Sequence, residues 1–136
     1  MKRSFTLIEI LVVVTIIILL TATAAVSYSS FLKQSRDAKR KADVEQIRAA
    51  LEMYRSNTNT YVITADLAPL VAGSYIQTIP TPPKSGAYTY APSSCAGGVC
   101  SSYTLTATLE NGDIYAAGPY GADVLPTPTP TTIPIP

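Results

Sequence analysis

The sequence predicts an α+β fold, in which one long N-terminal helix packs on a small three-stranded antiparallel sheet. An uncharged apolar run leads without a break into an amphipathic helical pattern. Short stretches that alternate apolar and polar residues follow a turn-rich segment. Alternating prolines, which cannot pair within a sheet, occupy the last residues. The expected segments are a basic leader at 1–4, an apolar helix at 5–32, an amphipathic helix at 33–56, a sheet domain at 57–125 and a tail at 126–136.

The apolar segment 5–32 has the composition of a membrane helix. No charged residue occurs between Ile10 and Leu32. About 20 helical residues rise roughly 30 Å, which is the thickness of a bilayer core. Lys2 and Arg3 precede the run, and such cations favour an N-terminus on the cytoplasmic side. The sequence therefore predicts a single-pass membrane protein whose sheet domain lies outside, with the lipid bilayer as an early partner.

Glu9 is an acid within this apolar run. A charged acid at the centre of a membrane helix costs about 2.5–3.5 kcal/mol on insertion scales, so such residues usually have a specific partner. Three interpretations compete at this point. The run is a cleaved secretory signal with Ala22-Thr23-Ala24 as its small-residue cleavage site, or a plain membrane anchor, or a segment in which Glu9 has a role of its own.

The string Ser4-Phe-Thr-Leu-Ile-Glu-Ile-Leu-Val-Val13 resembles the prepilin signature of type IV pilins and of type II secretion pseudopilins. The resemblance extends into the amphipathic helix. In that family, a prepilin peptidase would cut between Ser4 and Phe5, and the new amine of Phe5 would be N-methylated. Glu9 would pair with the Phe5 amine of a neighbouring subunit and set the register of assembly. The family fold is a long helix on an antiparallel meander, as the residue patterns also predict.

The resemblance implies a structural subunit of a type IV pilus, a helical homopolymer assembled from the cytoplasmic membrane by the pilus machinery. The filament would then lie on the cell surface and serve adhesion, twitching motility or DNA uptake. One alternative is a pseudopilin, which works with the secretion machinery in a periplasmic pseudopilus. Major pseudopilins usually carry an acidic calcium site, and here only Asp113 and Asp123 are available. A second alternative is a secreted or membrane-anchored binding module.

Segment 33–56 carries an apolar stripe at helical spacing, formed by Val44, Ile47, Leu51 and Tyr54. This stripe is expected to dock on the sheet. A basic cluster precedes it, and we interpret it as a solvated helix face or a contact with anionic headgroups, with DNA kept as a further candidate partner. The cluster consists of Lys33, Arg36, Lys39, Arg40 and Lys41.

The sheet is expected to contain three strands. A short strand is predicted at Tyr88–Tyr90, a strictly alternating one at Tyr103–Leu109 and a returning one at Asp113–Ala117. Asn111-Gly112 between the last two predicts a type I′ turn. The proline-rich tail favours polyproline II and is interpreted as a spacer or a segment glycosylated on threonine.

Cys95 and Cys100 are the chain's two cysteines, and an extracytoplasmic compartment would allow a disulfide between them. The chain contains no histidine, so we expect no metal site and no cofactor. The lack of a histidine base and of a glycine-rich phosphate loop also predicts that the protein is not an enzyme.

Overall fold

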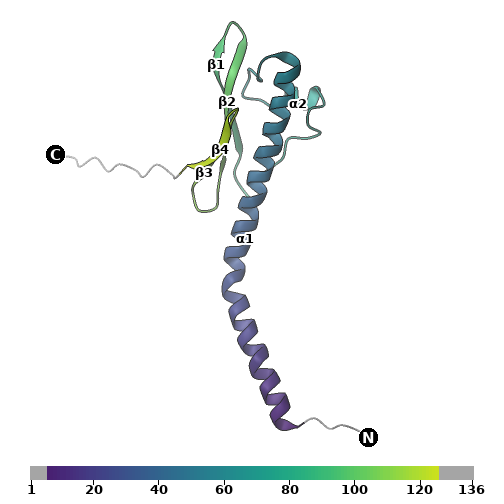
Figure 1. Cartoon of the computed structure of the whole chain (residues 1–136), viewed down its shortest axis with the longest axis vertical. Coiled ribbons are helices and arrows are strands. Elements are labelled where there is room, and N and C mark those ends of the chain that lie inside the picture. The colour runs from purple at the N-terminus through teal and green to yellow at the C-terminus, as the bar shows by residue number, and fades with distance from the viewer. Residues whose placement is uncertain (1–5, 126–136) are drawn as a thin grey trace, which may run out of the picture. The chain divides into compact units, whose positions relative to one another are not determined.

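The structure is a computed structural model that describes residues 6–125, without the side chains of residues 23–27. Its elements are α1 at Leu7–Thr58, α2 at Ala68–Ala72, β1 at Tyr88–Ala96, β2 at Val99–Thr108, β3 at Ile114–Gly118 and β4 at Gly121–Leu125 (Figure 1). The chain divides into two compact units, Met1–Ser35 and Arg36–Pro136, and α1 contributes residues to both. The predicted cleavage site at Ser4 and Phe5, and the predicted tail, lie outside the described residues.

Two parts of the predicted fold class are wrong. The antiparallel sheet has four strands in the order β1-β2-β3-β4, not three. In addition, among the described residues there is no helix that combines the length and the apolar character needed to cross a membrane. The membrane-spanning half assigned to 5–32, and with it the single-pass location, is therefore corrected.

The fourth strand was missed because its sequence is a poor strand signal. A two-residue loop, Pro119-Tyr120, joins β3 to β4 between Gly118 and Gly121, which form the closing pair of the hairpin. Gly121 has a φ of +152°, a conformation that side-chain-bearing residues rarely adopt. The strand itself is five residues long and includes glycine and aspartate, both of which are depleted in strands.

The turn between β2 and β3 also differs from the prediction. Gly112 donates its N–H to the carbonyl of Leu109 at 3.1 Å, and Leu109 donates to the carbonyl of Asp113 at 2.8 Å. Gly112 has a φ of +94°, whereas Asn111 is not among the residues with positive φ. A type I′ turn requires positive φ at both central residues, so this turn is instead a type I turn followed by a glycine bulge.

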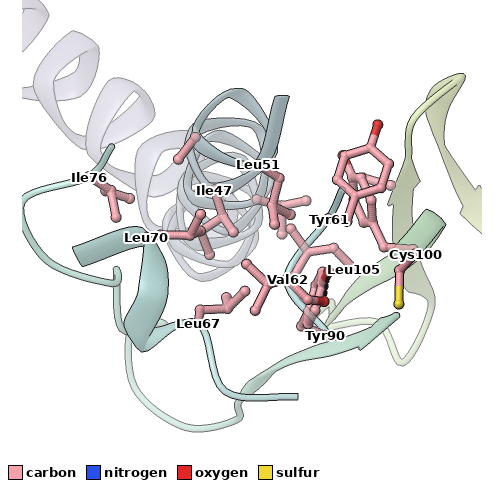
Figure 2. Packing of buried hydrophobic residues seen from close by; sticks show 14 of the residues in the cluster. Ile47, Leu51, Tyr61, Val62, Leu67, Leu70, Ile76, Tyr90, Cys100 and Leu105 are labelled. Carbon is pink, nitrogen blue, oxygen red and sulfur yellow. Dashed lines mark hydrogen bonds between the residues drawn. The ribbon is translucent and has the colours of Figure 1, made fainter. Parts of the chain in front are cut away.

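The predicted stripe of the amphipathic helix is confirmed as core. Val44, Ile47 and Leu51 are fully buried, and Tyr54 packs at the edge of the same cluster. Figure 2 shows Ile47 and Leu51 turned toward residues that follow the helix. The residues around them include Val62, Leu67, Leu70 and Ile76 from the connecting segment, with Tyr90, Tyr103 and Leu105 from the sheet.

Tyrosine hydroxyls from the sheet, and that of Tyr61 in the segment after α1, meet carboxylates along the flanks of α1. Tyr88 of β1 donates to Asp43 at 2.6 Å, and Tyr115 of β3 donates to Glu45 at 2.9 Å. Glu52 accepts from Tyr61 at 2.9 Å and from Tyr103 of β2 at 3.3 Å. These contacts give the half-buried hydroxyls polar partners where the ring bodies enter the core, which is how buried tyrosines are usually satisfied.

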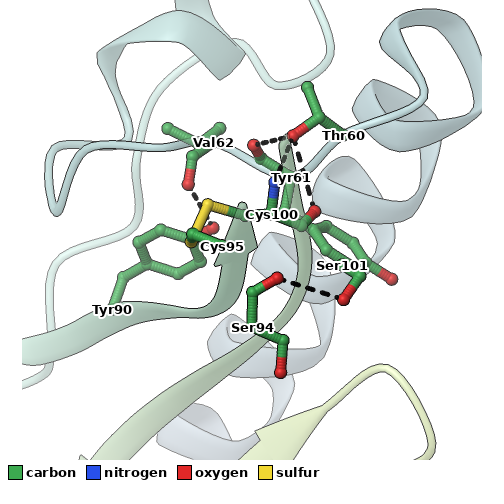
Figure 3. The surroundings of a disulfide bond; sticks show 8 residues. All are labelled: Thr60, Tyr61, Val62, Tyr90, Ser94, Cys95, Cys100 and Ser101. Carbon is green, nitrogen blue, oxygen red and sulfur yellow. Dashed lines mark hydrogen bonds between the residues drawn. A yellow bond between two sulfur atoms is a disulfide. The ribbon is translucent and has the colours of Figure 1, made fainter. Parts of the chain in front are cut away.

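The β1–β2 hairpin ends in Gly97-Gly98, whose φ values of +58° and +80° suit a two-residue turn. The structure contains the expected disulfide between Cys95 and Cys100, directly across this hairpin. Figure 3 shows residues 60–62 beside Cys100. The Cys100 N–H donates to the Thr60 hydroxyl at 2.8 Å, and the Tyr61 N–H donates to the Cys100 carbonyl at 3.0 Å. The disulfide-linked hairpin therefore binds the segment that follows α1 through these two backbone hydrogen bonds.

Replacing both cysteines, as Cys95→Ser with Cys100→Ser, should lower the free energy of unfolding. Closing so short a loop contributes about 2 kcal/mol when the disulfide restricts the unfolded chain. Urea unfolding followed by far-ultraviolet circular dichroism measures the change. Reductant should lower the stability of the native chain by a similar amount and leave the double variant unchanged. Equal stabilities of native chain and variant would contradict the prediction.

Candidate assembly site

The first turn of α1 is fixed by Thr6, which stands just before the helix. The Thr6 carbonyl accepts hydrogen bonds from the N–H groups of Glu9 at 3.1 Å and Ile10 at 3.4 Å. Its hydroxyl also accepts from the Glu9 N–H at 3.3 Å. A threonine in this position satisfies one of the amides that a helix start leaves without an intrahelical partner. Thr6 is therefore the N-cap of α1.

This cap gives Glu9 a defined position, the third residue of the helix, where its side chain is exposed. A carboxylate is favourable in the first turn because the helix dipole places partial positive charge there. Threonine followed three residues later by glutamate is the sequence signature of a capping box. The signal was present in Thr6-Leu-Ile-Glu9, but it was missed because Glu9 was interpreted as an acid in a membrane segment and as an assembly residue, and not as part of a helix cap.

Over the residues that directly follow Glu9, the exposed surface of α1 is apolar on every side. Ile10, Leu11, Val12, Val13 and Val14 are consecutive and all between 46% and 57% exposed. Successive helical residues are about 100° apart, so five of them cover the whole circumference. A helix that is apolar all round is normally covered by other molecules or other parts of a protein. The exposed residues continue with Ile16, Ile17, Ile18, Leu19 and Leu20.

The threonines within this segment do little to make it polar. Thr15 donates its hydroxyl to the Val12 carbonyl at 2.8 Å, and Thr21 donates to the Ile17 carbonyl at 2.9 Å. Such bonds to the preceding turn satisfy the hydroxyls without solvent.

A shallow groove also runs along one face of the segment, lined by Thr6, Leu7, Ile10, Leu11, Val14 and Thr15.

The other predicted site residues are placed as follows. Ser4 and Phe5 lie outside the described residues. The two acids weighed as calcium ligands have local partners. Asp113 accepts from the side-chain amide of Asn111 at 2.6 Å, and Asp123 accepts from the Val124 N–H at 2.7 Å. Within residues 6–125 no three metal-binding side chains gather.

Two arginines of the basic cluster are used inside the Arg36–Pro136 unit. Arg36 makes two hydrogen bonds to Glu110, at 3.0 and 3.1 Å, in the two-point geometry that guanidinium groups favour. Arg40 is 3% exposed and contacts Asp37 at 2.7 Å and Glu110 at 3.1 Å. Asp37 also accepts the backbone N–H of Glu110 at 2.9 Å. Through these bonds to Glu110, the side chains of Arg36, Asp37 and Arg40 hold the β2–β3 turn against α1.

This use of the arginines weakens the case for DNA as a partner. Among the described residues, the cluster leaves Lys33, Lys39 and Lys41 without an ion pair, and Lys41 lies 5.6 Å from the centre of the Tyr115 ring. Three cations offer fewer phosphate contacts than the five expected from the sequence, and the affinity for DNA depends on that number.

Comparison with known proteins identifies no relative. No protein-family model, no curated protein and no solved structure matches the chain.

The Glu110 cluster predicts how the stability depends on pH. The hydrogen bonds from Arg36, assisted by those from Arg40, lower the pKa of Glu110 from 4.5 to about 2. A lowered pKa in the folded state means that ionised Glu110 stabilises the fold above pH 4.5. This contribution is lost as the pH falls from 4.5 toward 2.

Glu110→Gln should therefore lower the melting temperature at pH 7, and the difference from the native chain should shrink toward zero near pH 2. Thermal unfolding at half-unit pH steps measures this. Asp66→Asn is the control, because it removes one exposed carboxylate that, among the residues the structure describes, accepts a hydrogen bond from the Ala68 N–H at 3.0 Å. A difference between Glu110→Gln and the native chain that does not depend on pH would overturn the prediction.

Proposed function

We propose that this protein is a structural subunit of a filament of the type IV pilin kind, in which copies join through the first part of α1. One observation carries the proposal: just after its first turn, the exposed surface of α1 is apolar around its whole circumference, and a single carboxylate stands in that first turn. Burying this surface is the main favourable term available to it, at roughly 25 cal/mol for each Å² removed from water. Packing among copies of the same helix supplies apolar neighbours on every side.

Apolar packing alone would let such helices slide along one another. A charged pair fixes the register, because it forms only when two particular groups meet. Glu9 would supply the negative partner, and the Phe5 amine of a neighbouring copy, made by cleavage after Ser4, would supply the positive one. Two unit charges 4 Å apart attract by roughly 4 kcal/mol at an effective dielectric constant of about 20. This is large enough to select one register over its alternatives.

The exposure of Glu9 supports this role, because an outer copy can reach its carboxylate. The cap at Thr6 supports it too, since it holds the Glu9 backbone in one place. The same geometry also gives Glu9 a purely local use, which is to stabilise the first turn. A local cap of this kind contributes about 1 kcal/mol. Loss of the charge pair should therefore reduce assembly more than loss of the cap would.

Glu9→Gln should leave the fold of the Arg36–Pro136 unit unchanged and lower filament yield by at least roughly tenfold, because the amide keeps the shape but not the charge. Filaments are counted by electron microscopy in cells that also produce a prepilin peptidase. Asp66→Asn is the matched control, with the same change of charge away from α1, and should give normal yield. Native filament yield from Glu9→Gln would rule out the charge-pair mechanism.

The first residue of the mature chain distinguishes the filament hypothesis from the binding-module hypothesis. Mass spectrometry of the mature chain should find N-methylated Phe5 if a prepilin peptidase processes the protein. A chain that begins at Ala25 would mean a conventional secretory signal and would exclude this filament proposal. It would also remove every apolar residue of α1 on which the proposal depends.

A further inference from the structure

The β2–β3 turn contains an asparagine followed by a glycine, and in this dipeptide the backbone can react with the side chain. The Gly112 nitrogen can attack the side-chain carbonyl carbon of Asn111, because glycine has no side chain to hinder the approach. Asn111 is exposed, so water reaches the site. The other asparagines, Asn57 and Asn59, are each followed by threonine, whose branched Cβ hinders the same attack. Asn111 is therefore the asparagine at which the sequence favours deamidation.

The reaction needs water and no other reagent. The Gly112 nitrogen gives its proton to hydroxide and bonds to Cγ of Asn111. The bond between Cγ and Nδ2 breaks, and Nδ2 takes up a proton from water and leaves as ammonia. Water then opens the cyclic imide at either of its carbonyls, which leaves aspartate or isoaspartate at position 111. No group is oxidised or reduced.

In the folded chain both reacting groups have other partners. The Gly112 N–H donates to the Leu109 carbonyl at 3.1 Å, and this hydrogen must be given up before the nitrogen can attack. The Asn111 Nδ2, which must leave, donates to the Asp113 carboxylate at 2.6 Å. The Asn111 Oδ1 accepts the Asp113 N–H at 3.1 Å, and this bond alone would favour attack, because a donor stabilises charge that develops on the oxygen. The bonds to Leu109 and to the Asp113 carboxylate therefore slow the reaction.

Further hydrogen bonds keep the turn closed. Leu109 donates its N–H to the Asp113 carbonyl at 2.8 Å, and Glu110 donates its N–H to Asp37 of α1 at 2.9 Å. Backbone groups held in this way are released by local unfolding, which is rare where a segment is tied to its neighbours. The Gly112 nitrogen is thus freed mainly when the turn leaves α1.

We propose that Asn111 is a site of spontaneous deamidation, which the folded turn slows and which loosens the turn once it has occurred. The aspartate product places a second carboxylate beside that of Asp113, where Nδ2 had donated, and like charges so close repel each other. The isoaspartate product lengthens the main chain before Gly112 by one carbon and shifts its N–H away from Leu109. Either product weakens the turn that carries Glu110. The inference does not depend on the filament proposal.

The first test follows the full-length native chain at neutral pH in a nonionic detergent, with and without urea sufficient to unfold it. Proteolysis and mass spectrometry measure deamidation at each asparagine, and fragmentation by electron transfer distinguishes aspartate from isoaspartate. In urea, Asn111 should react faster than Asn57 and Asn59. In the folded chain, Asn111 should react at least roughly tenfold more slowly than in urea, because its hydrogen bonds must first break. Equal rates at the three asparagines in urea, or an equal rate at Asn111 in both states, would overturn the proposal.

Asp113→Ala tests the assigned cause, because it removes the carboxylate and keeps the backbone N–H at 113. The ratio of the Asn111 rates in urea and in the folded chain cancels any direct effect of the substitution on the reaction. This ratio should fall by roughly fivefold, since a charged acceptor has been lost. Asp66→Asn loses the same charge elsewhere and should keep the native ratio. Asp113→Ser replaces Asp113→Ala if circular dichroism shows that the alanine variant is unfolded. A native ratio in the folded variant would refute the role of Asp113 and with it the proposal.

Asn111→Asp reproduces the aspartate product and tests its effect on the turn. It should lower the melting temperature at neutral pH, and the loss should shrink in acid as the new carboxyl group is protonated. Gln77→Glu makes the same change of charge at an exposed side chain away from the turn and should leave the melting temperature close to native. A melting temperature of Asn111→Asp equal to that of the native chain would show that deamidation does not loosen the turn.

Discussion

The buried charge of Arg40 is the constraint on which the sheet-bearing unit depends. A guanidinium group that is almost wholly removed from water must have its charge and its donors matched, because an unpaired buried charge is strongly destabilising. Arg40 meets this demand with Asp37 on its own helix, with Glu110 in the β2–β3 turn, and with the carbonyls of Pro83 and Ser85 at 3.2 and 3.3 Å. Three segments that are far apart in the sequence are thereby brought to one point. Its Nε is the one buried side-chain polar atom in the described residues without a partner, so this cluster is nearly but not fully satisfied.

Away from this point, the apolar stripe and the tyrosines decide how α1 lies on the sheet. The stripe gives the attraction, which is not directional. The tyrosine hydroxyls add direction, because Tyr88 and Tyr115 each reach a particular carboxylate on α1. In the first part of α1 the apolar side chains are instead exposed, and in the proposed filament other copies would cover them. The single helix α1 thus carries a stripe that is buried against its own chain and an apolar segment that is exposed.

Patterns local in the sequence predicted much of this fold. Helical spacing identified Val44, Ile47 and Leu51 as core, and a disulfide was expected because Cys95 and Cys100 are the chain's only two cysteines. The errors have physical causes. β4 is short and poor in strand formers, and the membrane interpretation was based on the length and composition of the apolar run and on the cations before it. The partners of Arg40 could not be predicted, because Glu110 is 70 residues away and no periodicity links the two. At the candidate site, the position of Glu9 was readable from Thr6, whereas the proposed pairing with the Phe5 amine came only from the resemblance to pilins.

The tyrosines at the helix–sheet interface also give the protein a built-in optical reporter. The chain has nine tyrosines and no tryptophan, so its near-ultraviolet absorbance and emission come from tyrosine. Burial, together with nearby Asp43, raises the pKa of Tyr88, and burial raises that of Tyr90 and Tyr103. These rings stay neutral in the folded protein at alkalinities where exposed phenols ionise, and their neutral form favours the fold until the pH rises well above 10. The ultraviolet signal of tyrosinate at high pH therefore distinguishes a docked helix from a detached one without any label.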